Sequence, residues 1–202
     1  MTNDKAAFTL AEVLITLGII GVVAAMTIPN LITSYKIHVI HKKLLKSYSV
    51  IQQVDRMMRA DDLDAEMYMA NSQTPYSNIF KEYLTGASYC KFSIAKYYRN
   101  SEMGPGTLDD GCLVDSNGII YMFENMYNKN ILKPKLFITV DINGYNVKPN
   151  RVGVDLFMFQ YVNGGFKTAG SQGTASNSEW FTRTYKVFND PNYVKEVLKT
   201  LK

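Results

Sequence analysis

Apolar residues run almost without interruption from Phe8 to Ile28, and one glutamate, Glu12, stands near the start of this run. An α-helix rises about 1.5 Å per residue, so a helix over residues 8–28 is long enough to cross a hydrocarbon layer about 30 Å thick. Small residues on one face would let another helix approach closely; they are Gly18, Gly21, Ala24 and Ala25. The pattern predicts a transmembrane helix that carries one carboxylate.

A second helical pattern follows Pro29, a residue that removes one backbone hydrogen bond and loosens or kinks a helix. Apolar residues then recur every three or four positions, at Ile37, Ile40, Leu44, Tyr48, Ile51, Val54 and Met58. The opposite face is polar, with Lys36, Lys42, Lys43, Lys46 and Gln53. We therefore expect one helix from about Phe8 to Ala60, whose amphipathic half, residues 29–60, packs on a globular head of residues 61–202.

The head alternates short apolar runs with turn signals. In "CLVDSNGIIYMF", the Asp115–Gly118 turn predicts a hairpin, because Asn-Gly supplies the positive φ that a tight turn needs. The remaining expected elements are strands at Lys135–Ile142 and Gly153–Val162, a helix at Ser77–Leu84 capped by Ser77, a surface loop at Asn163–Ser178, and a C-terminal helix capped by Asp190. The predicted fold is α+β, a long N-terminal helix against a small antiparallel sheet.

Chain length and charge limit the classes of partner that we expect. The chain has 202 residues, enough for one ordinary domain beyond the apolar run, and a mild net charge of +4. Basic residues cluster just after the apolar run, which suits lipid headgroups. No Lys/Arg stripe interleaved with aromatic residues occurs elsewhere, so no nucleic-acid partner is expected.

Two cysteines, Cys90 and Cys112, leave two interpretations open. They are too few for a tetrahedral zinc site unless His38 and His41 join them, and these histidines lie beside the apolar run. In an exported head the cysteines would form a disulfide worth about 3 kcal/mol in the chain-entropy model. In a cytosolic head they would be two free buried thiols.

Oxygen-bearing side chains at Asp141, Asn143 and Asp155 are of the kind that Ca²⁺ accepts, although the EF-hand spacing fails. Asp and Asn also favour turns for reasons of their own, and we prefer the turn interpretation here and at Asp109 and Asp110. Calcium at these residues is the one metal candidate, and no other cofactor is expected. No histidine can reach the acidic loops as a base, so catalysis is not expected either.

The apolar run itself allows three interpretations. A plain anchor and a secretory signal peptide, cut near Ala25, both leave Glu12 without a use. An ionised side chain at the centre of a bilayer costs about 2.5–3.5 kcal/mol on insertion scales, and less near an interface. The third interpretation gives the glutamate a role.

The stretch "AFTLAEVLITLGIIGVVAAMTIPNLI" resembles the amino terminus of the type IV pilin and type II secretion pseudopilin superfamily. The resemblance rests on a polar leader of residues 1–7, then Phe-Thr-Leu-x-Glu from Phe8 to Glu12, then an apolar helix with Pro29. It implies that a prepilin peptidase cuts between Ala7 and Phe8 and methylates the new amino group of Phe8. The family has Gly before the cut, where this chain has Ala7.

The same resemblance implies a role for Glu12 in assembly, because its carboxylate can pair with the freed amine of Phe8 in a neighbouring subunit. The chain would be a structural, non-catalytic filament subunit, single-pass in the bacterial inner membrane with its N-terminus cytoplasmic and its head periplasmic before it enters the filament. Its implied partners are the prepilin peptidase, like subunits, the membrane lipid, and the inner-membrane platform and ATPase. The alternative is a secreted or membrane-anchored calcium- or glycan-binding protein that does not polymerise.

Overall fold

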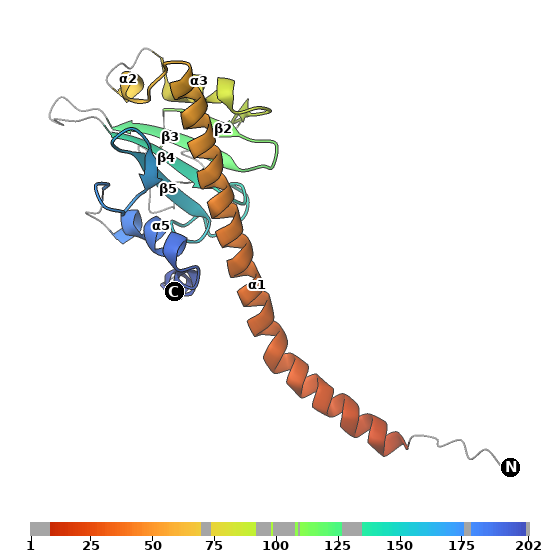
Figure 1. The fold of residues 1–202 in the computed structure, drawn as a ribbon. Helices are drawn as coiled ribbons and strands as arrows, with labels where there is room; N and C mark the ends of the chain where they lie inside the picture. The colour runs from red at the N-terminus through yellow and green to blue at the C-terminus, as the bar shows by residue number, and fades with distance from the viewer. Residues whose placement is uncertain are drawn as a thin grey trace. The chain divides into compact units, whose positions relative to one another are not determined.

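The computed structural model describes residues 9–69, 74–91, 98, 108, 110–126, 135–175 and 179–200. It is an α+β fold, with the long helix α1 (Leu10–Ala60) and a six-stranded antiparallel sheet (Figure 1). The chain divides into two compact units, residues 1–39 and residues 40–202. The expected fold class is confirmed.

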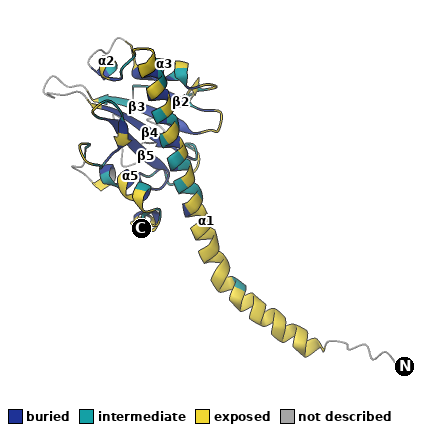
Figure 2. Ribbon diagram, in the orientation of Figure 1, coloured by how far each residue is buried: buried dark blue, intermediate teal, exposed yellow. Residues whose placement is uncertain are grey.

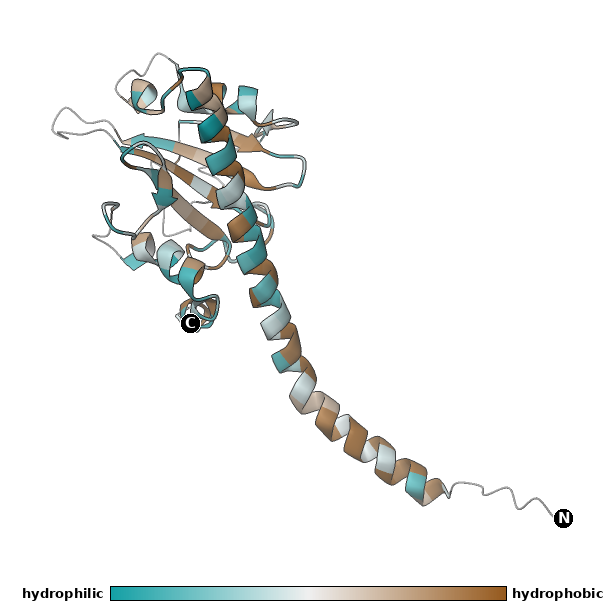
Figure 3. Ribbon diagram, in the orientation of Figure 1, coloured by the Kyte–Doolittle hydropathy of each residue, from teal (hydrophilic) through white to brown (hydrophobic). Residues whose placement is uncertain are grey.

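The amino-terminal unit consists of the first part of α1, which runs through Pro29 without interruption. Its apolar side chains are exposed on every side, from Leu10 at 78% to Leu31 at 70% (Figure 2). Figure 3 shows the same stretch as predominantly hydrophobic. Within the described part of the chain, α1 is the one helix long and apolar enough to cross a membrane, by length and composition.

The sheet of the second unit is a meander, in which each strand pairs with its neighbour in sequence. Its strands are β1 (Ser88–Tyr89), β2 (Cys112–Val114), β3 (Ile120–Met126), β4 (Lys135–Asp141), β5 (Leu156–Tyr161) and β6 (Phe166–Thr168). The predicted hairpin joins β2 to β3: Asp115 Oδ1 accepts the backbone N–H groups of Asn117 and Ile119, and Gly118 takes the positive φ of 76°. A side chain at Gly118 would strain this turn.

One face of the sheet is covered by residues 40–60 of α1 and by α3 (Tyr76–Tyr83). The short α2 (Glu66–Met69) lies between these two helices in the sequence. The predicted apolar stripe of α1 lies in this interface, since Leu44, Ile51, Val54 and Met58 are buried. Aromatic rings complete it: the Tyr48 and Phe159 centroids are 5.4 Å apart, and those of Phe80 and Phe123 are 5.2 Å apart. Such pairs add to the stability that area burial gives.

The other face of the sheet is covered by α5 (Glu179–Asn189), which α6 (Tyr193–Lys199) follows. The Phe181 ring lies 5.7 Å from that of Phe137, and the Thr184 hydroxyl accepts the Met158 N–H at 2.8 Å. With both faces covered, all six residues of β5 are buried. This explains why β4 and β5 read as nearly continuous apolar runs.

The structure differs from the local expectations at four points. The predicted loop at Asn163–Ser178 contains β6, and the helix α5 was not expected at all. Ser77 lies inside α3 rather than at its cap, and its hydroxyl donates to the Asp110 carbonyl at 3.0 Å. Lys43, expected on the exposed face of α1, donates its Nζ to the Ile142 carbonyl at 2.9 Å, which makes it a contact to the sheet.

Candidate functional site

Glu12 lies in the first turn of α1, where Thr9 caps the helix. The backbone N–H and the hydroxyl of Thr9 both donate to Glu12 Oε2 at 2.8 Å, and the Glu12 N–H donates back to Thr9 Oγ1 at 3.2 Å. This reciprocal arrangement is a capping box, which satisfies amide groups that the start of a helix leaves unpaired. The signal "TLAE" was present in the sequence, but its capping role was missed.

The cap leaves part of Glu12 available. Its Oε1 accepts no hydrogen bond from any residue that the structure describes, whereas Oε2 accepts two. Both partners of the cap lie on the carboxyl side of the predicted cleavage point, so a cut before Phe8 would leave the cap intact. A carboxylate fixed at the helix start can therefore take a further positive partner.

Two hydroxyl groups near Pro29 are hydrogen-bonded within the helix itself. Proline has no N–H, so the carbonyl of Ala25 loses its usual partner. The Thr33 hydroxyl donates to the Pro29 carbonyl, and the Thr27 hydroxyl to the Val23 carbonyl, each at 2.9 Å. Hydroxyls bonded back to their own helix in this way need no water. The segment is suited to an apolar environment.

Ala7 and Phe8, between which the sequence predicts cleavage, lie outside the described residues. The cut, the methylation of Phe8, and the pairing of its amine with Glu12 stay predictions.

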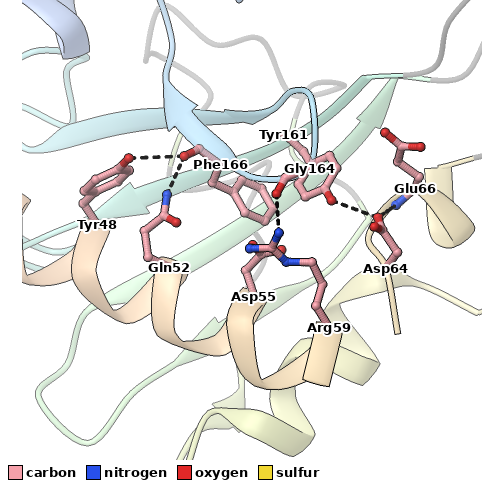
Figure 4. Close-up of polar contacts among 9 residues, drawn as sticks. All are labelled: Tyr48, Gln52, Asp55, Arg59, Asp64, Glu66, Tyr161, Gly164 and Phe166. Carbon is pink, nitrogen blue, oxygen red and sulfur yellow. Dashed lines mark hydrogen bonds and ion pairs between the residues drawn. The ribbon is translucent and has the colours of Figure 1, made fainter. Parts of the chain in front are cut away.

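In the second unit, α1 is fixed to the β5–β6 hairpin by side-chain hydrogen bonds to its backbone (Figure 4). The Tyr48 hydroxyl and Gln52 Nε2 both donate to the Phe166 carbonyl, at 3.3 Å and 2.5 Å. Two turns further, Arg59 Nη1 donates to the Gly164 carbonyl at 2.6 Å. These contacts hold the helix to the sheet at a hairpin more than 100 residues away in sequence.

Arg59 also neutralises a buried acid. Its Nη2 lies 2.7 Å from Asp55 Oδ2, and the Asp55 side chain is 2% exposed. Burial raises the pKa of Asp55 above its usual value, and the charge of Arg59 acts against that rise. Beside this pair, Asp64 accepts a hydrogen bond from the Tyr161 hydroxyl at 2.8 Å. The i, i+4 spacing of Asp55 and Arg59 permits an ion pair. No sequence pattern marks the rest of this network, because its acceptors include backbone carbonyls and its partners come from distant segments.

Cys90 and Cys112 form a disulfide. Cys112 begins β2, and the N–H of Cys90 donates to the carbonyl of Cys112 at 3.0 Å. The bond joins the end of β1 to the neighbouring strand. Of the two interpretations of these cysteines, the disulfide is confirmed.

The three oxygen-bearing residues lie together: Asp141 ends β4, Asn143 follows it, and Asp155 directly precedes β5. Asp141 Oδ1 accepts the N–H groups of Asn143 and Gly144, and Asp141 Oδ2 accepts the Tyr98 hydroxyl at 2.6 Å. Asn143 Nδ2 donates to Asp155 Oδ2 at 3.4 Å.

Asp155 in turn accepts the backbone N–H groups of Asn150 and Arg151. These contacts give both carboxylates a structural use in the turn. Among the described residues no group of three or more His, Cys, Asp or Glu side chains could hold a metal ion. Calcium at Asp141, Asn143 and Asp155 stays a prediction.

The two histidines have different surroundings. His38 is exposed, whereas the half-buried His41 has its Nε2 3.1 Å from the Phe188 carbonyl, at the end of α5. A carbonyl can only accept, so this ring nitrogen carries the proton. His41 thus joins α1 to α5.

Residues 2–28 match the family model described as the prokaryotic N-terminal methylation motif. Neither a search of curated proteins nor a search of solved structures found a match to the chain. The matched stretch includes the Thr9–Glu12 cap and the exposed apolar part of α1. The chain thus carries, at its amino terminus, the methylation motif that is the hallmark of type IV pilin and pseudopilin precursors.

Proposed function

We propose that the chain is a non-catalytic structural subunit of a type IV pilus-like or type II secretion pseudopilus filament. It is made as a membrane precursor, cut between Ala7 and Phe8 by a prepilin peptidase, and assembled through α1. Before assembly it spans the bacterial inner membrane once, with its head in the periplasm. The inner-membrane platform and its ATPase extend the filament.

The observation that carries this proposal is the methylation motif at residues 2–28 on a helix whose apolar surface is exposed all round. Side chains such as Leu14, at 61%, and Ile20, at 63%, have no partner inside the described chain. Water would not stabilise such a surface, so it needs lipid before assembly and the helices of other subunits afterwards. The small residues Gly18 and Gly21 have open space around them and permit close helix packing.

Glu12 is the residue that directs the joining of subunits. Its Oε2 is fixed by Thr9, which leaves Oε1 to accept the freed amine of Phe8 on a neighbouring subunit. An isolated carboxylate in lipid is costly, while a carboxylate paired with an ammonium is much less so. Joining two subunits therefore neutralises the Glu12 carboxylate, whose charge is unfavourable in lipid. The pairing also fixes the axial register of the two subunits.

The test compares the unmodified chain with Glu12→Val and with Glu12→Asp in a bacterium that produces the filament. We expect Glu12→Val to abolish assembly, and Glu12→Asp, which keeps the charge but shortens the side chain, to retain part of it. Sheared filaments are measured by immunoblot, and the mature amino terminus is determined by mass spectrometry. We expect a methylated Phe8.

Two results would contradict the proposal. A mature chain that starts near Met26 would identify a secretory signal peptide instead. Normal function of Glu12→Val would favour an anchored calcium- or glycan-binding module that does not polymerise.

A further inference from the structure

A groove of about 440 Å³ opens on the head beside α1. The apolar part of its lining, which we call the floor, is formed by Val50, Val54 and Met57 of α1, together with Leu84, and the rest of the lining is largely polar. Its rim carries Glu82, an exposed residue in the last turn of α3. The other rim carboxylate, Asp115, is occupied by N–H donors of its own turn. Glu82 forms no ion pair with any side chain that the structure describes.

The solvent-facing side of the same helix carries the opposite charge. Its exposed positions follow each other three or four residues apart, as one helix face does; they are Lys42, Lys46, Ser49, Gln53, Arg56 and Ala60. We call Lys42, Lys46 and Arg56 the basic stripe. Within the described ranges these three cations have no ion-pair partner, and the stripe contains no acid. Within its described residues, one chain thus displays the unpaired carboxylate of Glu82 beside a partly apolar groove and unpaired cations on its long helix.

We propose that the Glu82 groove of one subunit receives Lys46 of a second copy of this chain. A lysine matches the groove because its four-carbon stem can lie on the apolar floor of Val50, Val54 and Met57 while its ammonium reaches Glu82. This inference rests on the proposed function, since it places the contact between subunits of one filament.

The position of Lys46 along the helix suits a staggered arrangement. Subunits anchored by the same apolar segment have parallel α1 helices. Lys46 precedes Gln53, a lining residue of the groove, by seven positions. At about 1.5 Å per residue, a copy displaced by roughly 10 Å along the axis therefore brings its Lys46 level with the groove. Lys46 and the groove lie at different levels along α1, so the contact is not self-complementary and can repeat from copy to copy, which is the requirement for a filament.

The test is a charge swap in the full-length chain, with the yield of sheared filaments as the readout. We expect Glu82→Lys and Lys46→Glu each to lower the yield roughly tenfold or more, because each places like charges opposite one another. The double variant Glu82→Lys/Lys46→Glu restores attraction and should recover to within about threefold of the unmodified chain. Control variants of matched charge are Glu196→Lys and Lys195→Glu on α6, which should assemble normally.

We do not expect the single variants to lose filament yield through misfolding. A lysine at position 82 lies in the last turn of α3, where a positive charge is favourable. A glutamate at position 46 lies four residues from Lys42, a spacing that permits pairing. The amount of membrane-bound subunit and its Cys90–Cys112 disulfide are measured in every variant to verify this.

Two outcomes would overturn the inference: normal yields from both single variants, or a double variant as poor as the singles. Glu12→Val is measured in parallel. If Glu12→Val assembles normally, the proposed function itself fails, whereas its loss together with normal Glu82→Lys yields refutes the groove contact alone.

Discussion

At the scale of single residues, the head stabilises its buried carboxylates in two ways. Asp55, at 1% exposure, has the guanidinium of Arg59 as its partner. Asp141 and Asp155, at 0% and 1%, are held by N–H and hydroxyl donors instead, with no cation bonded to either carboxylate in the described part of the chain. Burial raises the pKa of Asp155 to about 6, and the nearby charge of Asp141 acts in the same direction. Without a cation beside it, the ionised carboxylate of Asp155 is costly at neutral pH.

This cost predicts a pH dependence of stability. Because the folded protein holds the Asp155 proton up to about pH 6, the protonated carboxyl contributes stability that is fully present below pH 3.8 and is lost as the pH rises through 6. We expect the free energy of unfolding to fall by about 2 kcal/mol between pH 4 and 7 from this group. Asp155→Asn should flatten that part of the profile.

The measurement is urea denaturation followed by circular dichroism in detergent, at several pH values between 4 and 7. Glu196→Gln, which changes an exposed acid, is the matched control and should leave the profile unchanged. An Asp155→Asn profile as steep as that of the unmodified chain would refute the assignment.

At the scale of elements, the β5–β6 hairpin depends on α1. Tyr48, Gln52 and Arg59 donate to its backbone carbonyls at two points, Phe166 and Gly164. A carbonyl acceptor is present on every residue, so no sequence pattern marks it. The same limit applies to α5, whose buried face includes Arg183 and Thr184 next to Phe181 and Val187. Polar residues on a buried face conceal the apolar period that would have predicted a helix.

The Asp55–Arg59 pair allows a test of this element. Arg59→Met keeps the apolar stem but removes both the cation and the donor to Gly164. We expect it to lower the free energy of unfolding by about 2 kcal/mol, since a buried carboxylate left alone is strongly destabilising. Combining it with Asp55→Asn should recover part of the loss. Arg56→Met, an exposed change on the same helix, should cost no more than about 0.5 kcal/mol.

Urea midpoints of the four proteins in a double-mutant cycle give the coupling between the two residues. Additive losses, without coupling, would mean that the ion pair contributes nothing to the attachment of the hairpin.

At the scale of the whole molecule, a disulfide and a meander sheet define the head. The bond Cys90–Cys112 closes a loop of 22 residues between β1 and β2. We expect Cys90→Ser/Cys112→Ser to lower the free energy of unfolding by about 3 kcal/mol, because the unfolded chain regains the entropy that the crosslink removed. Dithiothreitol should reduce the stability of the unmodified chain equally and leave the variant unchanged, as measured by urea midpoints. Equal midpoints with and without the bond would refute this.

The sequence predicted well those parts that local patterns determine. The stripe from Leu44 to Met58, the Asp115–Gly118 turn and the strands around residues 135–162 each follow a short-range rule of periodicity or turn chemistry. The edge strand β1, with two residues, and β6, among glycines, are too short to produce a pattern. Of the candidate site, the Glu12 motif was readable because it lies in one continuous stretch. The Glu82 groove was not, because α1, α3 and the β2–β3 turn meet only after folding.

The hydrogen bond from Gln52 to Phe166 spans 114 positions, whereas each strand pairs with the next one along the chain. During synthesis, the sheet can form one hairpin at a time. The apolar stripe of α1, which precedes the sheet in sequence, is fully covered only after the last hairpin, β5–β6, has formed. Residues 40–60 are thus translated before the whole sheet but are among the last segments of the head to find their permanent neighbours. A ribosome stalled before residue 166 would leave the apolar face of this helix partly exposed beside an incomplete sheet.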